Sequence, residues 1–200
     1  MARKGRRRQD HLARKAQAEG FHARSVYKLE ALDAKFGILA RRTARGAGLR
    51  VLDLGAAPGS WTQYAVGRGA SVVAVDLQEM SVAGADCRQG DLTDAATIDE
   101  LAAAGPFDVV MSDAAPSTTG NRLVDTGRSE ALVESILASI DRWLVSGGDC
   151  AFKLFQGGGE QRLLADLRTR FDTASLFRPK AVRSESFETY LVGIGFLGGG

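Results

Sequence analysis

Short apolar segments alternate with amphipathic segments along most of the chain after Gly48. The apolar runs have the length of buried strands, and they cover residues 51–54, 71–75, 107–112, 150–155 and 189–196. One more short strand is expected just before Asp91. Apolar residues recur every three or four positions elsewhere, which predicts helices at residues 23–36, 61–67, 93–104, 126–144 and 160–170. This alternation predicts an α/β fold, with a mainly parallel sheet covered by helices on both faces.

Charge is distributed unevenly along the 200 residues. Residues 1–50 contain 14 Lys and Arg but 4 Asp and Glu, whereas residues 51–200 contain 12 and 20. The net charge of +2 therefore conceals a basic first quarter and an acidic remainder. A basic segment of this kind favours a polyanionic partner, with nucleic acid first and an anionic membrane second.

Composition excludes several classes of protein. A hydrophobic fraction of 44% with 25% charged residues is typical of a globular domain. No apolar run approaches the roughly 20 residues that span a bilayer, and the basic N-terminus lacks the apolar stretch of a secretory signal. Cys87 and Cys150 stand alone in the sequence, which favours reduced core cysteines in a cytoplasmic protein over a metal site or a disulfide.

The first 20 residues are mostly polar and basic, and few apolar side chains are available to fold them. Two interpretations are compatible: a solvated tail, and an arm that becomes ordered when it binds RNA. We expect residues 1–20 to be a flexible RNA-binding arm and residues 21–197 to form one domain. The candidate RNA-binding side chains are Arg3, Lys4, Arg6, Arg7, Arg8, Arg14, Lys15 and Arg24.

Residues 51–61 read VLDLGAAPGSW, an apolar strand followed by a turn of small residues and the start of a helix. Small residues such as Gly55 and Gly59 allow a ligand to approach the backbone closely, at the edge where open α/β sheets bind ligands. The turn lacks the second glycine of the dinucleotide pattern G-x-G-x-x-G, and Asp53 adds a carboxylate that would repel a pyrophosphate. S-adenosylmethionine, which is cationic and carries no phosphate, suits this turn better.

More acidic residues follow at the ends of the next strands. Asp76 comes 23 residues after Asp53, a position from which a carboxylate can accept both ribose hydroxyls. Asp91 is expected to face the adenine edge, and Trp61 is expected to pack near the ligand. Taken singly, Asp53 and Asp91 are also explained as helix or turn caps, and Trp61 as a core residue. Their placement on successive strand ends favours a cofactor site.

Four further segments carry polar residues in unusual places: RSVYKL at 24–29, SDAAP at 112–116, CAFKLFQG at 150–157 and RSESFETY at 183–190. The least expected is Lys153, inside an apolar strand, although an edge strand or a snorkelling side chain would explain it. With these segments in this order, the chain resembles the FtsJ/RrmJ-type ribose 2′-O-methyltransferases, whose bacterial members act on large-subunit ribosomal RNA. The resemblance extends over about residues 20–197.

The resemblance implies a Rossmann-like, S-adenosylmethionine-dependent methyltransferase fold with a mostly parallel seven-stranded sheet. Ser60 departs from the second glycine that many members have, with little effect expected. The implied substrate is a uridine of 23S ribosomal RNA within the large subunit. A monomer is the default expectation, and no metal is required because the leaving group is a neutral thioether. A catalytic tetrad is implied at Lys28, Asp113, Lys153 and Glu188, with cofactor contacts at Gly59, Trp61, Asp76, Asp91 and Asp113.

A ribose 2′-hydroxyl is a poor nucleophile at neutral pH and has to lose its proton as it attacks the methyl group. Lys153 is the expected base, although an ordinary lysine has a pKa of about 10.4 and carries a proton. Lys28 and the sulfonium of the cofactor favour loss of that proton, whereas Asp113 and Glu188 oppose it. We therefore expect the carboxylates to orient Lys153, and Lys28 to steer the 2′-oxygen or a neighbouring phosphate.

Three other functions stay open at this point. A methyltransferase acting on transfer RNA or on messenger RNA caps would share the tetrad, although a chain this short has little room for a cap pocket. A nicotinamide-dependent oxidoreductase would use a similar sheet, but the missing G-x-G-x-x-G pattern argues against it. A ribosome-assembly factor would bind RNA without catalysis, and the intact tetrad argues against that.

Overall fold

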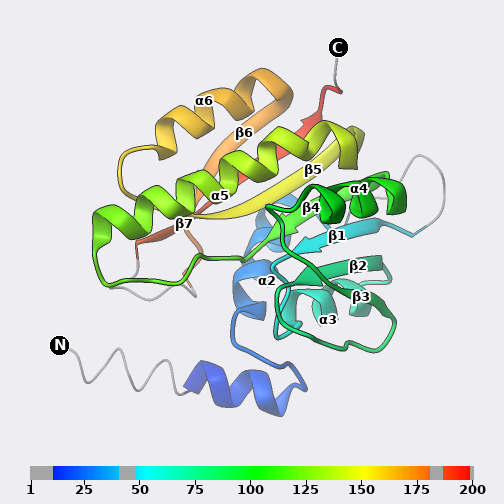
Figure 1. The fold of residues 1–200 in the computed structure, drawn as a ribbon. Coiled ribbons are helices and arrows are strands. Elements are labelled where there is room, and N and C mark those ends of the chain that lie inside the picture. Colours follow the sequence, from blue (N-terminus) through cyan, green and yellow to red (C-terminus); the bar gives the residue numbers. More distant parts are fainter. Residues whose placement is uncertain (1–10, 41–47, 181–186, 199–200) are drawn as a thin grey trace.

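The predicted sheet runs through the centre of the structure, a computed structural model that describes residues 11–40, 48–180 and 187–198. Its seven strands lie in the order β3-β2-β1-β4-β5-β7-β6 (Figure 1). Strands β1 to β5 pair in parallel, and β7 is antiparallel to both β5 and β6, which confirms a mostly parallel sheet. The strands are β1 (Arg50–Leu54), β2 (Ser71–Asp76), β3 (Ala85–Gln89), β4 (Phe107–Ser112), β5 (Leu144–Phe155), β6 (Phe171–Phe177) and β7 (Glu188–Phe196).

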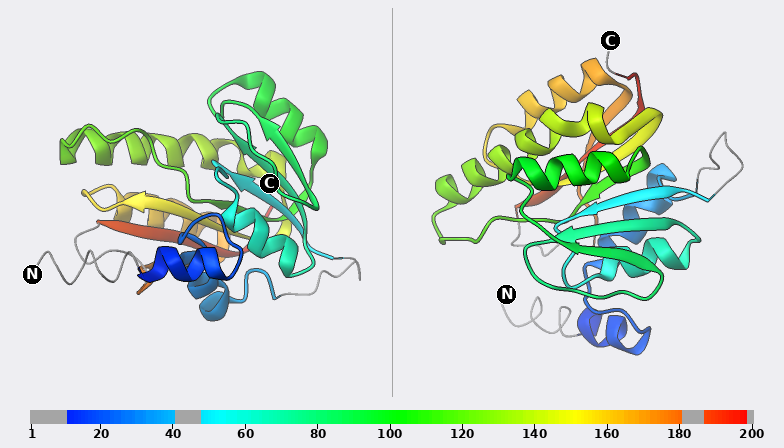
Figure 2. Two further views of the ribbon diagram at one scale, coloured as in Figure 1. Left: turned by 90° about the horizontal axis from the view of Figure 1, so that it is seen from below. Right: turned by 45° about the vertical axis from the view of Figure 1, so that its right-hand side comes forward.

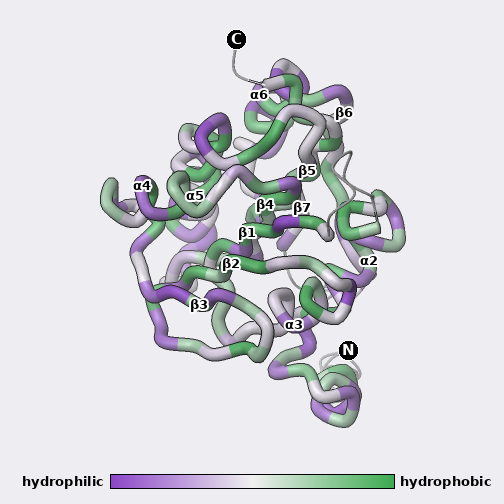
Figure 3. The backbone as a smooth tube through the Cα atoms, turned by 90° about the vertical axis from the view of Figure 1, so that its right-hand side faces the viewer, coloured by the Kyte–Doolittle hydropathy of each residue, from purple (hydrophilic) through white to green (hydrophobic). Residues whose placement is uncertain are grey.

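Helices cover both faces of the sheet, as predicted (Figure 2). One core contains Leu101 of α4, Trp143 of α5 and Leu163 of α6, and the opposite core contains Leu29 of α2 and Trp61 of α3. Hydrophobic positions gather on the central strands between these layers (Figure 3). Among the described residues, no helix has the length and apolar character needed to cross a membrane. The helices are α2 (Val26–Phe36), α3 (Ser60–Gly67), α4 (Ala95–Ala104), α5 (Arg122–Trp143) and α6 (Glu160–Arg170).

Strand β6 was not predicted from the sequence. It follows directly after α6 and pairs with β7 at the edge of the sheet. Its residues Asp172 and Thr173 are exposed and the next four are only partly buried. An edge strand that is half solvated lacks the continuous apolar run that marks a buried strand.

One helix and one strand begin earlier in the structure than the sequence predicts. Helix α5 begins at Arg122 instead of residue 126, because the side chain of Asn121 accepts hydrogen bonds from the N–H groups of Leu123 and Val124 and caps the helix there. Strand β5 begins at Leu144 instead of residue 150, through a serine and two glycines that are typical of a loop. The pairing of β4 with β5 shifts register between Phe107 and Val109, which accommodates this irregular start.

Residues 11–18, within the segment predicted to be a flexible RNA-binding arm, form a helix that packs against α2 and α3 (Figure 1). Ala16 is fully buried in a cluster with Val26 and Tyr27. The side chain of Gln63 ties the following turn to α3, since it accepts from the N–H of His22 at 2.9 Å and donates to the carbonyl of Gly20 at 3.2 Å. The predicted RNA contacts Arg3, Lys4, Arg6, Arg7 and Arg8 lie outside the described residues.

Candidate active site

Four charged residues from different elements meet at the carboxyl edge of the central strands. Lys28 lies in α2, Asp113 follows β4, Lys153 is in β5 and Glu188 begins β7. Nζ of Lys28 lies 3.0 Å from Oε2 of Glu188 and 3.3 Å from Oδ1 of Asp113. Nζ of Lys153 lies 3.4 Å from the same Oδ1 of Asp113. The structure thus brings the predicted tetrad together, with Asp113 between the two lysines.

Lys153 occupies an interior strand, and its side chain is 9% exposed. Because β5 pairs with β4 on one side and β7 on the other, the explanation of Lys153 as an edge-strand residue is wrong. Its Nζ also donates to the backbone carbonyl of Asp113. A buried amine needs oxygen partners, and Asp113 supplies both a carboxylate and a carbonyl. These contacts fix Nζ of Lys153 at the end of β4.

Tyr190 is a member of the cluster that sequence reasoning missed. It is fully buried, it pairs in register with Lys153, and its hydroxyl donates to Oδ1 of Asp113 at 2.7 Å. Burial, with a contribution from the Asp113 carboxylate, raises the pKa of Tyr190 well above its usual value, so that it stays a neutral donor. The period of two along a strand contained the signal, because Glu188 and Tyr190 share one face of β7.

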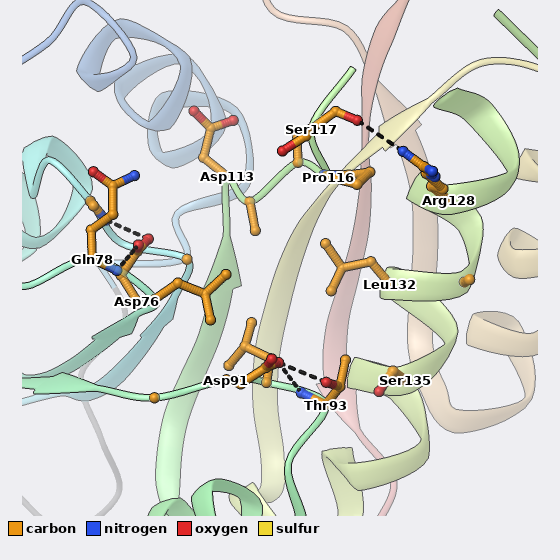
Figure 4. A pocket seen from close by; sticks show the side chains of 18 residues that line it. Asp76, Gln78, Asp91, Thr93, Asp113, Pro116, Ser117, Arg128, Leu132 and Ser135 are labelled. Atoms are coloured by element: carbon orange, nitrogen blue, oxygen red, sulfur yellow. Dashed lines mark hydrogen bonds between the residues drawn. The ribbon is translucent and has the colours of Figure 1, made fainter. Parts of the chain in front are cut away.

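A cavity of about 620 Å³ opens beside Asp113 (Figure 4). Asp76 and Gln78 face it from the end of β2, and Arg128, Leu132 and Ser135 face it from the other side, on α5 (Figure 4). This size is within the range of small-molecule and cofactor sites. Other residues that line it are Gly55, Ala57, Leu77, Gly90, Asp91, Leu92, Thr93, Ala114, Ala115, Pro116, Ser117 and Ala131.

The two predicted carboxylates of this cavity are held in place by their neighbours. Oδ2 of Asp76 accepts from the N–H of Ala57 at 2.9 Å, which links the ends of β2 and β1. Oδ1 of Asp91 accepts from the N–H and the hydroxyl of Thr93, so Asp91 lines the cavity and caps a turn as well. These hydrogen bonds lower the pKa of Asp91. Among the described residues, no group of three histidines, cysteines or carboxylates is placed to hold a metal ion.

Asp53 lines a smaller cavity of about 30 Å³ that adjoins the larger one. Gly55 and Asp113 line both cavities. Oδ2 of Asp53 accepts from the hydroxyl of Thr62 at 2.6 Å, whereas the buried Oδ1 has no hydrogen-bond partner among the residues that the structure describes. Burial raises the pKa of Asp53 to about 7. An unsatisfied buried acceptor beside a small cavity calls for a donor, such as a water molecule or a cation.

Trp61 and Gly59 shape the turn instead of lining the large cavity, and Gly55 does both. Trp61 is 3% exposed, and its indole N–H donates to the carbonyl of Ser25 at 2.9 Å, which holds the start of α2 against the site. Gly59 has a φ of 104°, and a Cβ there would lie 2.5 Å from a methyl group of Val82. Gly55 has a φ of 67°, and a Cβ there would lie 2.3 Å from that of Ala114. Only glycine permits both close approaches.

Asp125 of α5 organises one wall of the large cavity and was also missed from the sequence. Its side chain is buried, and Oδ1 accepts from the N–H of Thr119 at 2.7 Å and from its hydroxyl at 2.8 Å. Oδ2 accepts from the N–H of Gly120 at 3.2 Å. The segment from Ala114 to Ser117, which lines the cavity, leads directly into this turn.

Replacing Asp125 by alanine is expected to weaken cofactor binding roughly tenfold, because three donors in the turn lose their acceptor and the cavity wall loses its fixed position. Titration calorimetry with S-adenosylmethionine measures the effect. Asp141→Ala is the control, since this partly exposed carboxylate pairs with Arg170 at the far end of the same helix. Equal affinities of the two variants would show that Asp125 does not position the wall.

Three predicted RNA contacts lie in the described part of the chain. Arg14 and Arg24 line a shallow cavity of about 280 Å³ together with Gln17 and His22. Lys15 instead pairs with Glu19 at 3.5 Å and lies 4.6 Å from the ring centre of Tyr27. Arg14 and Arg24 therefore share one surface cavity, whereas the half-exposed Lys15 pairs with a residue one helical turn away.

Comparisons with known proteins agree with this architecture. The family described as FtsJ-like methyltransferase matches residues 21–196. Ribosomal RNA large subunit methyltransferase E of Treponema denticola is 46% identical over 94% of this chain and 96% of its own. The protein of the same name from Oleidesulfovibrio alaskensis is 42% identical over 94% of this chain and 92% of its own.

Among solved structures, a ribosomal RNA methyltransferase from Plasmodium falciparum superposes with a TM-score of 0.77. It is 26% identical, and the match covers 90% of this chain and all of that one. The expected Rossmann-like methyltransferase fold is therefore confirmed. Together with the match over nearly the whole chain, these similarities show that the chain belongs to the FtsJ-like methyltransferase family.

Proposed function

We propose that this enzyme methylates the ribose 2′-hydroxyl of a uridine in 23S ribosomal RNA, in the context of the large subunit. The observation that carries the proposal is the tetrad, with two lysines held on the carboxylate of Asp113, which also lines the large cavity. The names of the relatives support ribosomal RNA as the substrate. All four side chains come from one chain, which is consistent with a monomer, and we place the enzyme in the cytoplasm.

The methyl donor is S-adenosylmethionine, and the residues present fit it. Asp76 is placed to accept from ribose hydroxyls, and the unsatisfied Oδ1 of Asp53 suits the cationic amino acid part of the donor. The carboxylates at these strand ends would repel the pyrophosphate of a dinucleotide. When bound, the donor supplies an activated methyl group and leaves as a neutral thioether.

We assign a different role to each side chain of the tetrad. We assign Nζ of Lys153 to accept the proton of the 2′-hydroxyl. Only the neutral amine form of the lysine can accept it. Asp113 and Tyr190 hold that nitrogen in position, since the tyrosine hydroxyl and Lys153 contact the same carboxylate oxygen. Lys28, anchored by Glu188 at 3.0 Å, is placed to bind the 2′-oxygen or a nearby phosphate. Alignment of the reacting atoms supplies the rest of the rate enhancement.

Labelled S-adenosylmethionine offered with three RNA preparations tests the substrate. Large subunits from cells that lack the modification, 23S ribosomal RNA freed of protein, and transfer RNA are incubated with the enzyme. We expect label to enter the large-subunit RNA, at one uridine found by mapping the modified nucleotide. Label in transfer RNA alone would favour the other class of RNA methyltransferase, and label in none of them would favour a binding factor.

A further inference from the structure

An arginine and a phenylalanine side chain lie in contact near the tetrad, with an exposed leucine next in sequence to the arginine, and neither the chemistry nor the cofactor cavity uses them. We call Arg122, Leu123 and Phe187 the platform. The guanidinium of Arg122 lies 5.2 Å from the ring centre of Phe187, and it donates to the carbonyl of Gln156 at 3.3 Å. Phe187 itself packs edge-on against Phe155, with ring centres 4.8 Å apart. Phe155 therefore supports the ring of Phe187, which in turn contacts the guanidinium of Arg122.

The platform faces solvent. Arg122 is exposed, and the Leu123 side chain next to it is 80% exposed in the first turn of α5. Leu123 therefore offers an exposed apolar side chain next in sequence to the charge of Arg122. Glu160 lies nearby, but its Oε2 is engaged by the N–H groups of Gly157 and Gly158, at 3.2 and 2.7 Å.

The platform is connected directly to the reacting groups. Phe187 precedes Glu188, and its carbonyl accepts from the N–H of Gln156, which lies three residues after Lys153. Phe155 pairs in register with Glu188. When an RNA strand places one ribose at Lys153, its next nucleotide would therefore lie close to the platform.

The exposed guanidinium of Arg122 lies over the Phe187 ring in a cation–π contact, and unpaired nucleobases stack on arginine and aromatic planes. The guanidinium of Arg178 donates to Oε1 of Gln156 at 3.4 Å, so a second positive charge lies next to the platform. We propose that the platform binds the base of an unpaired nucleotide adjacent to the methylated one, an inference that rests on the proposed function. The combination of a flat cation, an apolar side chain and a second cation fits a base and its phosphate.

Binding of a fluorescein-labelled twelve-nucleotide oligouridine, followed by fluorescence anisotropy, tests the platform. Arg122→Ala is expected to weaken binding about tenfold, as the loss of one stacked base predicts. Arg122→Lys keeps the charge but loses the plane, so we expect a similar loss of affinity with an unchanged salt dependence. Arg142→Ala is the matched control, because this arginine pairs with Asp99 at the other end of α5 and should leave binding unchanged.

Two results would contradict the proposal that the platform binds a nucleobase. Wild-type affinity in Arg122→Lys would show that only charge matters there, and equal affinities of Arg122→Ala and Arg142→Ala would show that the site is not used. Failure of the proposed function is distinct from either, since it would appear as wild-type protein that binds the oligouridine but methylates no RNA.

Discussion

Replacing Lys153 by methionine is expected to lower the rate of methyl transfer by about a thousandfold, while S-adenosylmethionine still binds. Methionine preserves much of the volume of lysine inside β5 but cannot accept a proton. Positioned general bases contribute roughly 10²–10⁴ to a rate, so the loss falls in that range. Single-turnover transfer to large-subunit RNA measures the rate, and titration calorimetry measures cofactor affinity.

The control for this prediction is Lys35→Met, which removes the same charge from a lysine at the end of α2. Lys35 lies over the rings of Phe36 and Phe177, away from the tetrad. Its activity is expected to match that of wild type. Substantial transfer by Lys153→Met would mean that another group or solvent takes the proton, and Lys153 would lose its assigned role.

Replacing Asp53 by asparagine is expected to change how stability depends on pH. Because burial raises the pKa of Asp53 from 3.8 to about 7, the folded protein holds a proton that the unfolded chain has released between these values. Asp53 therefore destabilises the fold progressively as the pH rises from about 4 to about 7, by about 4 kcal/mol at most. Asparagine does not ionise, so this pH dependence of stability is absent from Asp53→Asn.

Urea unfolding of both proteins at pH 5 and pH 7.5 measures this effect. The free energy of unfolding of wild type is expected to fall relative to that of Asp53→Asn as the pH rises. Cofactor binding gives a second, independent readout: a cation next to Asp53 favours its ionised form, so wild-type affinity should rise with pH up to about 7. A constant difference in stability between the two proteins would contradict the raised pKa.

Asp53 also illustrates how much of the site is visible in the sequence alone. The hydrophobic pattern shows where strands end, and parallel strands bring their carboxyl ends to one edge, so the pattern already predicts that Asp53, Asp76 and Asp113 lie together. The same hydrophobic pattern shows that Lys153 stands inside an apolar strand. The strand order, which makes β5 interior and so rules out an edge position for Lys153, depends on long-range pairing and not on local sequence.

The residues that were missed act through contacts far apart in the chain. Tyr190 looked like an ordinary strand residue until β7 paired with β5 and brought its hydroxyl to Asp113, 77 positions away. The helix at residues 11–18 has few apolar side chains, and the burial of Ala16 depends on Val26 and Tyr27 of another helix. Local propensity predicts such elements poorly, because their stability comes from tertiary packing.

The proposed function depends most directly on where the methyl group goes. Large-subunit RNA methylated with labelled donor is hydrolysed in alkali, which requires a free 2′-hydroxyl to cleave the chain, and the products are separated by size. We predict that the label appears in an alkali-resistant dinucleotide, and that with Lys153→Met it appears about a thousandfold more slowly. Label confined to mononucleotides would place the methyl group on a base and would contradict a tetrad built to deprotonate a ribose hydroxyl.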